Sequence, residues 1–255
     1  MNQCPRSIAR IVPALVLLPL LAACAGGPRT GAGGPAPVTV GVIGLNDFHG
    51  SIEAPRTAVM VPDGQGGARP VPAGGAAFLA SAVESVRKNY TNSVTVAAGD
   101  LTGASQIASS LFLDEPAIGV LNRIGLDFNA VGNHEFDQGT EELLRKQTGG
   151  CAQHTARKPC QIERFEGAKF KYLAASTVRA DGSTLFPATG IRSFGKGRSA
   201  VQVGIIGLTL KDTSNLVSPD GIKGLTFGDE AAAINAQVPR LRQAGADAVI
   251  VLIHQ

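Results

Sequence analysis

Three of the four histidines in this chain lie in polar clusters that directly follow apolar segments. The clusters are Asn-Asp-Phe-His-Gly at residues 46–50, Gly-Asp at 99–100, Gly-Asn-His-Glu-Phe-Asp at 132–137, and His254 near the end of the sequence. Their side chains include carboxylates, an amide and imidazoles, which are the groups that bind hard and borderline divalent cations. If folding brings the clusters together, they could form a metal site.

Each cluster taken alone has a plain structural explanation. Asp47 and His49 could belong to a turn, Asp100 could sit in the turn after a strand, and Asn133 could cap a helix. Taken together they favour a metal site. The alternation of Asp47 and His49 predicts that both side chains reach one side of an extended strand end. A carboxylate such as Asp100 can bridge two cations, so the set suits a two-metal site with ions roughly 3.5–4 Å apart.

Apolar strands that alternate with helices are expected to position these clusters. Near-continuous apolar runs predict five buried strands, at residues 38–45, 93–98, 127–131, 201–209 and 247–253. Helical spacing and helix-start residues predict helices at 75–89, 117–124, 140–147 and 229–244. Thr140 is a candidate N-cap, Pro239 is expected to kink the last helix, and residues 54–74 and 148–170 are expected to be long loops. The alternation indicates a layered α/β fold, in which ligands bind beyond the carboxyl ends of strands.

In this order the motifs resemble those of the calcineurin-like metallophosphoesterases. Within that group the chain is similar to the exported 5′-nucleotidase family, which also includes UDP-sugar hydrolases and 2′,3′-cyclic phosphodiesterases. The specific part is the run at residues 132–137, in register with the earlier Asp-x-His and Gly-Asp, and the resemblance covers residues 38–255. It implies a layered α/β metallophosphoesterase domain that hydrolyses phosphate esters. Nucleoside 5′-monophosphates or related nucleotides are the expected substrates, in nucleotide breakdown or salvage outside the cytoplasm.

The resemblance also implies a set of metal ligands. Asp47 and His49 would bind the first metal, Asp100 would bridge both, and Asn133 would bind the second with His254 beside it. The expected cofactors are therefore two divalent cations. Mn, Mg, Zn and Co all accept these ligand types, so the sequence leaves their identity open.

His134 and Asp137 are the catalytic residues that the resemblance implies. His134 would not bind metal; it would face the phosphate and stabilise the transition state or the leaving oxygen. Asp137 would fix the tautomer of His134 and raise its pKa, which keeps a hydrogen-bond donor aimed at developing charge. A helix cap is the simpler role for Asp137, and the two roles are compatible.

The first 37 residues are predicted to lie outside the folded domain. Residues 1–23 resemble a lipoprotein signal peptide: Arg6 and Arg10 precede an apolar segment at 11–21 that is too short to span a membrane. Small residues directly before Cys24 predict lipidation of that cysteine, and an ordinary secretory peptide is the alternative. Residues 24–37 form a Gly/Pro-rich tether. The protein is therefore expected to be exported and lipid-anchored to a bacterial membrane, facing the periplasm or the cell exterior.

Charge and cysteine content indicate which ligands the chain binds and how its cysteines pair. The chain has 23 basic and 20 acidic residues, and removal of the signal peptide leaves 21 and 20, a net charge of +1. With no basic runs, this gives no electrostatic basis for binding a nucleic-acid polymer, so a small phosphorylated substrate is expected. Cys151 and Cys160 predict a local disulfide in an exported protein. A zinc site with the nearby His154, otherwise a surface residue, is the alternative.

The family has a further His-x-His or His-x-Gln segment after the motif at His254, and a C-terminal domain whose aromatic residues sandwich the base. Neither lies within the 255 residues. We therefore expect the 38–255 domain to be incomplete at its C-terminus, and the chain by itself to show weak or no activity. A lipoprotein solute-binding module, a sulfur-ester hydrolase of the same superfamily and a non-catalytic relative are the alternative functions.

Overall fold

The computed structural model describes residues 37–197 and 200–254. Pro37 and the residues after it form one compact unit. The predicted signal peptide, Cys24 and nearly all of the tether lie outside the described residues. Among the described helices, none is long and apolar enough to cross a membrane.

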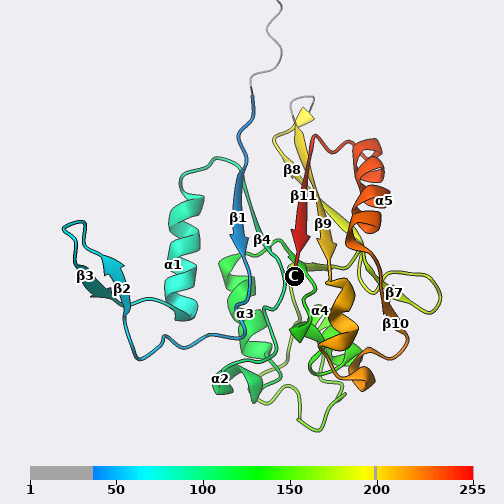
Figure 1. Cartoon of the computed structure of the whole chain (residues 1–255), viewed down its shortest axis with the longest axis horizontal. Helices are drawn as coiled ribbons and strands as arrows, with labels where there is room; N and C mark the ends of the chain where they lie inside the picture. The colour runs from blue at the N-terminus through cyan, green and yellow to red at the C-terminus, as the bar shows by residue number, and fades with distance from the viewer. Residues whose placement is uncertain (1–36, 198–199, 255) are drawn as a thin grey trace, which may run out of the picture. The chain divides into compact units, whose positions relative to one another are not determined.

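Two sheets form the centre of the domain (Figure 1). The first has the strand order β1-β4-β5-β6, and all its strands run parallel: Gly41–Leu45, Ser93–Ala97, Phe128–Ala130 and Lys171–Leu173. The second has the order β11-β9-β8, in which β9 is parallel to β11 and antiparallel to β8: Ala248–Ile253, Val201–Leu208 and Thr189–Phe194. All five predicted strands are present, although β1 begins at Gly41 and not at residue 38. The predicted α/β layers are therefore confirmed, with two sheets at their centre.

The two sheets pack against each other through a cluster of buried side chains. This cluster takes residues from six strands and both sheets: Val94, Val96, Phe128, Ala130, Leu173, Phe194, Val203, Ile205 and Leu252. Burial of a Val, Leu, Ile or Phe side chain contributes about 1.5–3 kcal/mol. The cluster therefore fixes the two sheets relative to each other, which matters because the metal-site residues come from both.

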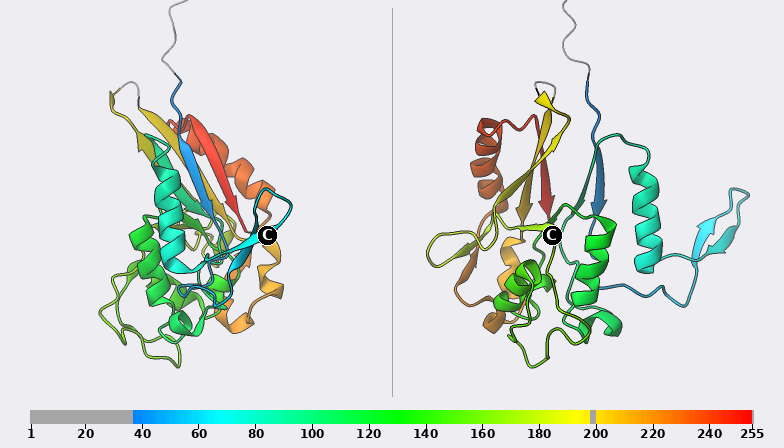
Figure 2. Two further views of the ribbon diagram at one scale, coloured as in Figure 1. Left: turned by 90° about the vertical axis from the view of Figure 1, so that its left-hand side faces the viewer. Right: turned by 180° about the vertical axis from the view of Figure 1, so that it is seen from behind.

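Helices cover the outer faces of the sheets. α1 (Gly75–Arg87) packs on β1 and on α3 (Glu115–Ile124), while α5 (Glu230–Gln243) packs on β9 and β11 on the opposite side (Figures 1 and 2). α4 (Thr140–Thr148) and the short α2 (Ile107–Ser110) lie beyond the carboxyl ends of the first sheet. α5 continues through Pro239.

The sequence of α3 shows why a helix forms at this place. Pro116 occupies the first turn, where its missing N–H costs nothing, and Gly125 ends the helix in the left-handed conformation that glycine adopts easily. Ala117, Ile118 and Leu121 recur at helical spacing and are completely buried. This apolar face packs into the largest core cluster of the described residues, which also contains Phe48, Leu101 and Phe136 from the loops that follow β1, β4 and β5.

Some predictions were wrong. Residues 54–74 are not a continuous loop, because β2 (Val59–Pro62) and β3 (Ala68–Val71) form an antiparallel hairpin. The side chain of Asp63 accepts hydrogen bonds from the backbone of Gln65 and Gly67, which closes the turn between the two strands. Thr140 does not cap α4: Gly139 precedes the helix, and the Thr140 hydroxyl donates to the carbonyl of Gly221.

The sequence pattern did not predict β8, and it also missed three shorter strands. They are β6 in the first sheet and β7 (Thr177–Arg179) paired with β10 (Leu225–Phe227), each of three residues. Three residues are too few to show the alternation by which a strand is read from sequence. Residues 149–170 contain no helix or strand, as expected, and a disulfide joins Cys151 to Cys160 within them. That bond excludes the alternative zinc site.

Candidate metal centre

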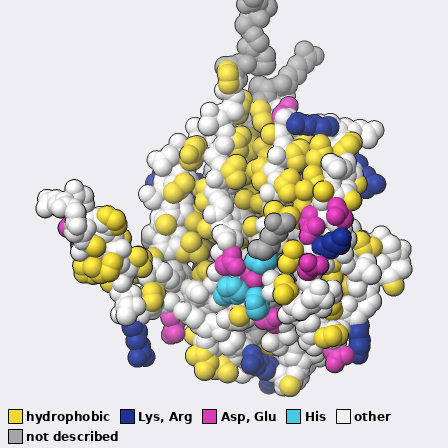
Figure 3. All heavy atoms as spheres, in the orientation of Figure 1, with side chains coloured by type: hydrophobic (Ala, Val, Ile, Leu, Met, Phe, Trp, Pro, Cys, Tyr) yellow, Lys and Arg dark blue, Asp and Glu magenta, His cyan; other side chains and the backbone are white. Residues whose placement is uncertain are grey.

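The predicted metal-site residues follow the carboxyl ends of strands from both sheets. Asp47 and His49 follow β1, Asp100 follows β4 and Asn133 follows β5, all at the carboxyl end of the first sheet. His254 follows β11 of the second sheet. Figure 3 shows acidic and histidine side chains gathered on this face, at the ends of β1 and β11. The site is therefore shared between two sheets and is not confined to the edge of one.

A turn, and not an extended strand, presents Asp47 and His49. β1 ends at Leu45, and the two residues have φ angles of 50° and 44°, in the left-handed region. Their backbone N–H groups donate to the carbonyls of Gly99 and Asp100 at 3.1 and 3.0 Å. The expected extended alternation is therefore wrong at this place, because the chain folds back onto the loop after β4. The turn still brings both side chains together.

Asp100 lies at the centre of the cluster and is 3% exposed. Its Oδ2 atom is 3.0 Å from Nε2 of His254 and 3.9 Å from Nε2 of His49. Its Oδ1 atom accepts the backbone N–H of His134 at 3.0 Å. Burial raises the pKa of this carboxyl group, but the hydrogen bonds from His254 and His134 outweigh burial and hold the pKa below its ordinary value. Asp100 is therefore a carboxylate placed between two imidazoles.

Backbone carbonyls fix the orientation of both imidazole rings. Nδ1 of His49 lies 2.9 Å from the carbonyl oxygen of Gly103, and Nδ1 of His254 lies 3.0 Å from that of Ala98. A carbonyl can only accept, so Nδ1 carries a proton in both rings, and Nε2 is the atom directed at Asp100. Ligand atoms of Asp47, His49 and Asp100 lie within 4.8 Å of one another, as a shared cation requires. The donor atoms present therefore fit a divalent metal.

His134 and Asp137 form a hydrogen-bonded pair beside this cluster. Nδ1 of His134 lies 2.9 Å from Oδ2 of Asp137, and the rings of His134 and His49 are 5.1 Å apart at an interplanar angle of 80°. Partial burial lowers the pKa of His134, but the hydrogen bond and charge of Asp137 raise it more, so the net shift is upward. Asp137 also accepts the backbone N–H of Ala104 at 3.0 Å, and does not cap α4.

Asn133 lies directly before the 3₁₀ turn His134–Phe136 and is partly buried. Within the residues that the structure describes, its side-chain amide makes no hydrogen bond, so its oxygen is available to a ligand.

Glu135 is a site residue to which the sequence motif gave no role. It is completely buried, and its carboxylate accepts the backbone N–H groups of Gly132, Asp100, Leu101 and Thr102 at 2.7–3.3 Å. Burial, and then the charge of Asp100, raise the pKa of Glu135. This side chain joins the loop after β4 to the loop after β5. The sequence shows only that an acidic residue stands between a histidine and a phenylalanine. The partners of Glu135 are backbone N–H groups, which every residue type except proline carries, so the sequence does not reveal this role.

Comparison with known proteins connects this geometry to a family. No family model matches the chain. The chain is 46% identical over 162 residues to an uncharacterized protein of Acinetobacter calcoaceticus, which covers 62% of this chain and 79% of the relative. It is also 27% identical over 223 residues to the NAD 5′-nucleotidase of Haemophilus influenzae, covering 85% of this chain. A solved structure of the same Haemophilus enzyme superposes with a TM-score of 0.62 over 84% of this chain, at 24% identity. The chain resembles the 5′-nucleotidases in sequence, and its fold is that of the calcineurin-like phosphoesterases.

Most of these relatives are much longer than this chain. It spans 32% of the Haemophilus enzyme and 17% of the endonuclease YhcR of Bacillus subtilis, to which it is 33% identical over 218 residues. The family is one of metallophosphoesterase hydrolases.

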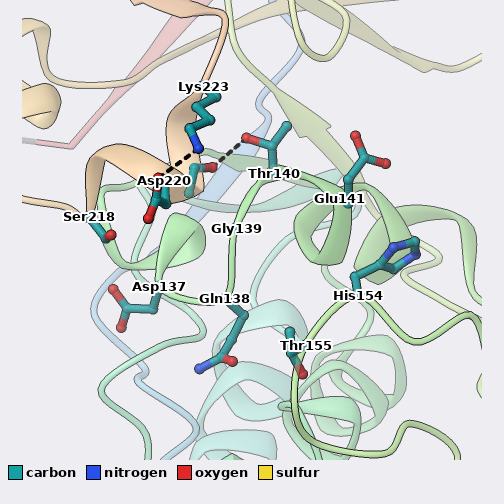
Figure 4. Close-up of a pocket in the computed structure, with 11 residues that line it drawn as sticks. Asp137, Gln138, Gly139, Thr140, Glu141, His154, Thr155, Ser218, Asp220 and Lys223 are labelled. Atoms are coloured by element: carbon teal, nitrogen blue, oxygen red, sulfur yellow. Dashed lines mark hydrogen bonds and ion pairs between the residues drawn. The ribbon is translucent and has the colours of Figure 1, made fainter.

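A hollow of about 500 Å³ opens beside Asp137 (Figure 4). Its lining is polar: Asp137, Gln138, Gly139, Thr140, Glu141, His154, Thr155, Ser218, Asp220, Gly221 and Lys223. Asp220 and Lys223 pair at 2.8 Å, and among the described residues the His154 imidazole is the one aromatic ring that lines the hollow. His154, expected to be a plain surface residue, is exposed but contributes to this hollow. The hollow meets the candidate metal centre through Asp137.

Proposed function

We propose that this domain hydrolyses phosphate esters at a centre of two divalent cations, with nucleoside 5′-monophosphates as the leading substrate class. The observation that carries this proposal is the position of Asp100. Its Oδ2 atom lies between the Nε2 atoms of His49 and His254, at 3.9 and 3.0 Å. A carboxylate between two imidazoles of fixed tautomer is what a bridging ligand requires.

Asp47 and His49 would hold one cation on one side of Asp100, and Asn133 and His254 would hold the other. When bound, the cations would supply Lewis acidity for the phosphoryl oxygens and for the attacking water. The carbonyls of Gly103 and Ala98 hold the two imidazoles in place, so these two rings are oriented before a cation binds.

His134 is the proposed group that stabilises the leaving oxygen. Its Nδ1 is committed to Asp137, which leaves Nε2–H as a donor. Because the pKa of His134 is raised, the protonated ring persists to higher pH than an isolated imidazole would. Its distal nitrogen can then donate a hydrogen bond to negative charge that develops on the ester oxygen.

The substrate class is proposed from the relatives and from the polar hollow. Printed names among the relatives include NAD 5′-nucleotidase and, for a protein of Treponema pallidum 28% identical over 219 residues, probable 5′-nucleotidase. The hollow beside Asp137 carries hydroxyl, amide and carboxylate groups, which suit the hydroxyl groups of a sugar.

Metal content and phosphate release test the proposal together. The purified chain dialysed against Mn²⁺ should retain about two ions per chain, whereas Asp100→Asn should retain fewer than one. Any release of inorganic phosphate from AMP, which is expected to be weak in this chain, should depend on Mn²⁺ and should fall below detection in Asp100→Asn. The matched control is Asp212→Asn, which changes an exposed carboxylate outside the site motifs. Equal metal content in the wild type and Asp100→Asn would rule out the proposed centre.

A second candidate function is cleavage of phosphodiesters in nucleic acid. It is favoured by one observation: the relative named endonuclease YhcR is 33% identical and aligns with 85% of this chain. The small net charge argues against a long nucleic-acid partner. Parallel assays with AMP and with single-stranded DNA, both with Mn²⁺, separate the two functions by which substrate is consumed.

The proposed place of action is outside the cytoplasm, with the chain anchored through a lipid on Cys24. Support comes from the positive start, the apolar segment at 11–21 and the small residues before this cysteine. Expressed in a bacterium fed an alkyne fatty acid, the chain should become labelled and sediment with membranes. Cys24→Ser should abolish both, and a labelled Cys24→Ser chain would disprove the anchor.

A further inference from the structure

The loop after β4 is held by carboxylates along its whole length. Residues 100–104 are consecutive, and each of their backbone N–H groups donates to a carboxylate. The first three donate to Glu135, that of Gly103 donates to Asp114 at 3.1 Å, and that of Ala104 donates to Asp137 at 3.0 Å. The position of the loop is therefore set by three acidic side chains.

This loop in turn places the proposed metal ligands. Asp100 belongs to this loop, and the backbone carbonyl of Asp100 accepts the backbone N–H of His49. The carbonyl of Gly103 accepts Nδ1–H of His49 at 2.9 Å and so aims the other ring nitrogen at Asp100. A shift of the loop would therefore move the bridging carboxylate and one imidazole together.

Asp114 is the carboxylate of the three that lies outside the family motifs. It is 3% exposed, and its backbone adopts the left-handed conformation with φ of 62°. One oxygen accepts the Ser109 hydroxyl at 2.7 Å, and the other accepts Gly103 N–H and lies 3.8 Å from Nζ of Lys146. Burial raises the pKa of Asp114, but the charge of Lys146 and these hydrogen bonds lower it more. Asp114 is therefore a buried anion.

Lys146 approaches the same loop from α4. It is completely buried, which is costly for a cation unless it is paired, and its Nζ donates to Oγ1 of Thr102 at 3.1 Å. Lys146 of α4 and Asp114, the residue directly before α3, thus contact two adjacent loop residues, Thr102 and Gly103.

We propose that Asp114 and Lys146 are positioning residues of the metal centre, which hold the loop of residues 100–104 and through it Asp100 and His49. The inference rests on the proposed metal-dependent function. Replacement of Lys146 by methionine keeps the length of the side chain but leaves Asp114 buried without its counter-charge. Asp114 must then become protonated or turn away, and in either case its hydrogen bond to Gly103 weakens.

A purely stabilising ion pair is the competing explanation, and the neighbouring residue provides a matched control for it. Arg145 is also a buried cation of α4, 3% exposed. It pairs with Glu142 at 2.6 Å and with Glu115 at 2.8 Å, and donates to the carbonyl of Gly150 at 2.7 Å. None of these partners belongs to the loop. Arg145→Met should therefore destabilise the domain without moving the metal ligands.

Hydrogen exchange in the metal-free chain tests whether Lys146 holds the loop of residues 100–104. The backbone amides of residues 100–104 should lose about tenfold or more of their protection in Lys146→Met, relative to the amides of β9. In Arg145→Met these amides should change no more than those of β9. If Lys146→Met does not fold, Thr102→Val removes the same contact to the loop and should act in the same direction.

Mn²⁺ titration tests whether the position of this loop affects metal binding. Lys146→Met should bind Mn²⁺ about 10–100-fold more weakly than the unaltered chain, and Arg145→Met should bind it about equally well. Asp114→Asn combined with Lys146→Met should recover part of the loss, because an amide oxygen can still accept Gly103 N–H. Equal effects of Lys146→Met and Arg145→Met on loop exchange would overturn the inference. An unaltered chain that binds no Mn²⁺ would instead overturn the proposed function, and the exchange comparison would still decide the role of Lys146 in holding the loop.

Discussion

A buried carboxylate makes the stability of this domain sensitive to acid. Asp114 is 3% exposed, and Lys146 with the hydrogen-bond donors around it lowers its pKa below the ordinary value of 3.8 despite burial. A lowered folded-state pKa contributes stability above the unfolded value, and this contribution is lost as the pH falls through the folded value. Asp114 therefore stabilises the neutral protein and ceases to do so in acid.

The first prediction concerns that pH dependence. From about pH 5 to pH 2 the free energy of unfolding should fall more steeply in the wild type than in Asp114→Asn, because the variant has no proton to take up at this position. Urea unfolding of the metal-free protein at several pH values measures both slopes. Parallel curves for the two proteins would mean that Asp114 has the same pKa folded and unfolded.

At the scale of the element, α3 is held by its apolar face. Leu121 is completely buried in the largest core cluster, against loops that carry site residues. Leu121→Ala should lower the free energy of unfolding by about 2–5 kcal/mol, through lost burial and the cavity left behind. The same change at Leu111, which is 49% exposed, should cost less than about 0.5 kcal/mol. Chemical denaturation measures both, and similar losses would show that α3 is not held by its buried face.

The segment after α4 has no helix or strand of its own, so its stability depends on the disulfide and not on a buried apolar face. Glu115 accepts the backbone N–H of Cys160, and Arg145 donates to the carbonyl of Gly150, so the closed loop is tied to α3 and α4. Cys151→Ser with Cys160→Ser should cost about 2–3 kcal/mol, mainly by freeing the unfolded chain. Reduction of the wild type should lower its unfolding midpoint to that of the double variant. An unchanged midpoint after reduction would show that the bond does not contribute.

At the scale of the whole domain, the proposed metal centre joins two sheets. Asp100 follows a strand of the first sheet and His254 a strand of the second, and their side chains lie 3.0 Å apart. A cation bound by both would therefore hold the sheets together, and it would bind the folded state alone because no such site exists in the unfolded chain.

Mn²⁺ should consequently raise the unfolding temperature. At 100 times its dissociation constant it should add about 2.7 kcal/mol of stability, which corresponds to roughly 5–11 °C for a domain of this size. His254→Ala should lose most of that shift, whereas His154→Ala, an exposed residue outside the metal cluster, should keep it. Calorimetric scans with and without Mn²⁺ decide the matter, and the same shift in both variants would exclude His254 as a ligand.

The amino-acid sequence by itself determined which residue types follow which strands, and hence the chemistry expected of the site. It also determined the main strands and helices, because their apolar spacing extends over enough residues to be distinctive, as in α3 and β9. It did not reveal β6, β7 and β10, which have three residues each, or the hairpin formed by β2 and β3. Strands this short depend on the partner they meet and not on their own pattern.

Tertiary structure decided how the site is assembled. Packing of the two sheets brings His254 to Asp100 across 154 positions of sequence, and a left-handed turn, not an extended strand, presents Asp47 and His49. The same holds for Lys146, whose residue type on a helix predicts exposure, although it is completely buried beside the loop that carries Asp100. The spacing of residues along the chain predicts contacts between residues that are close in sequence. A buried charge or a bridging carboxylate depends on groups that are far apart in sequence and that only the packed fold brings together.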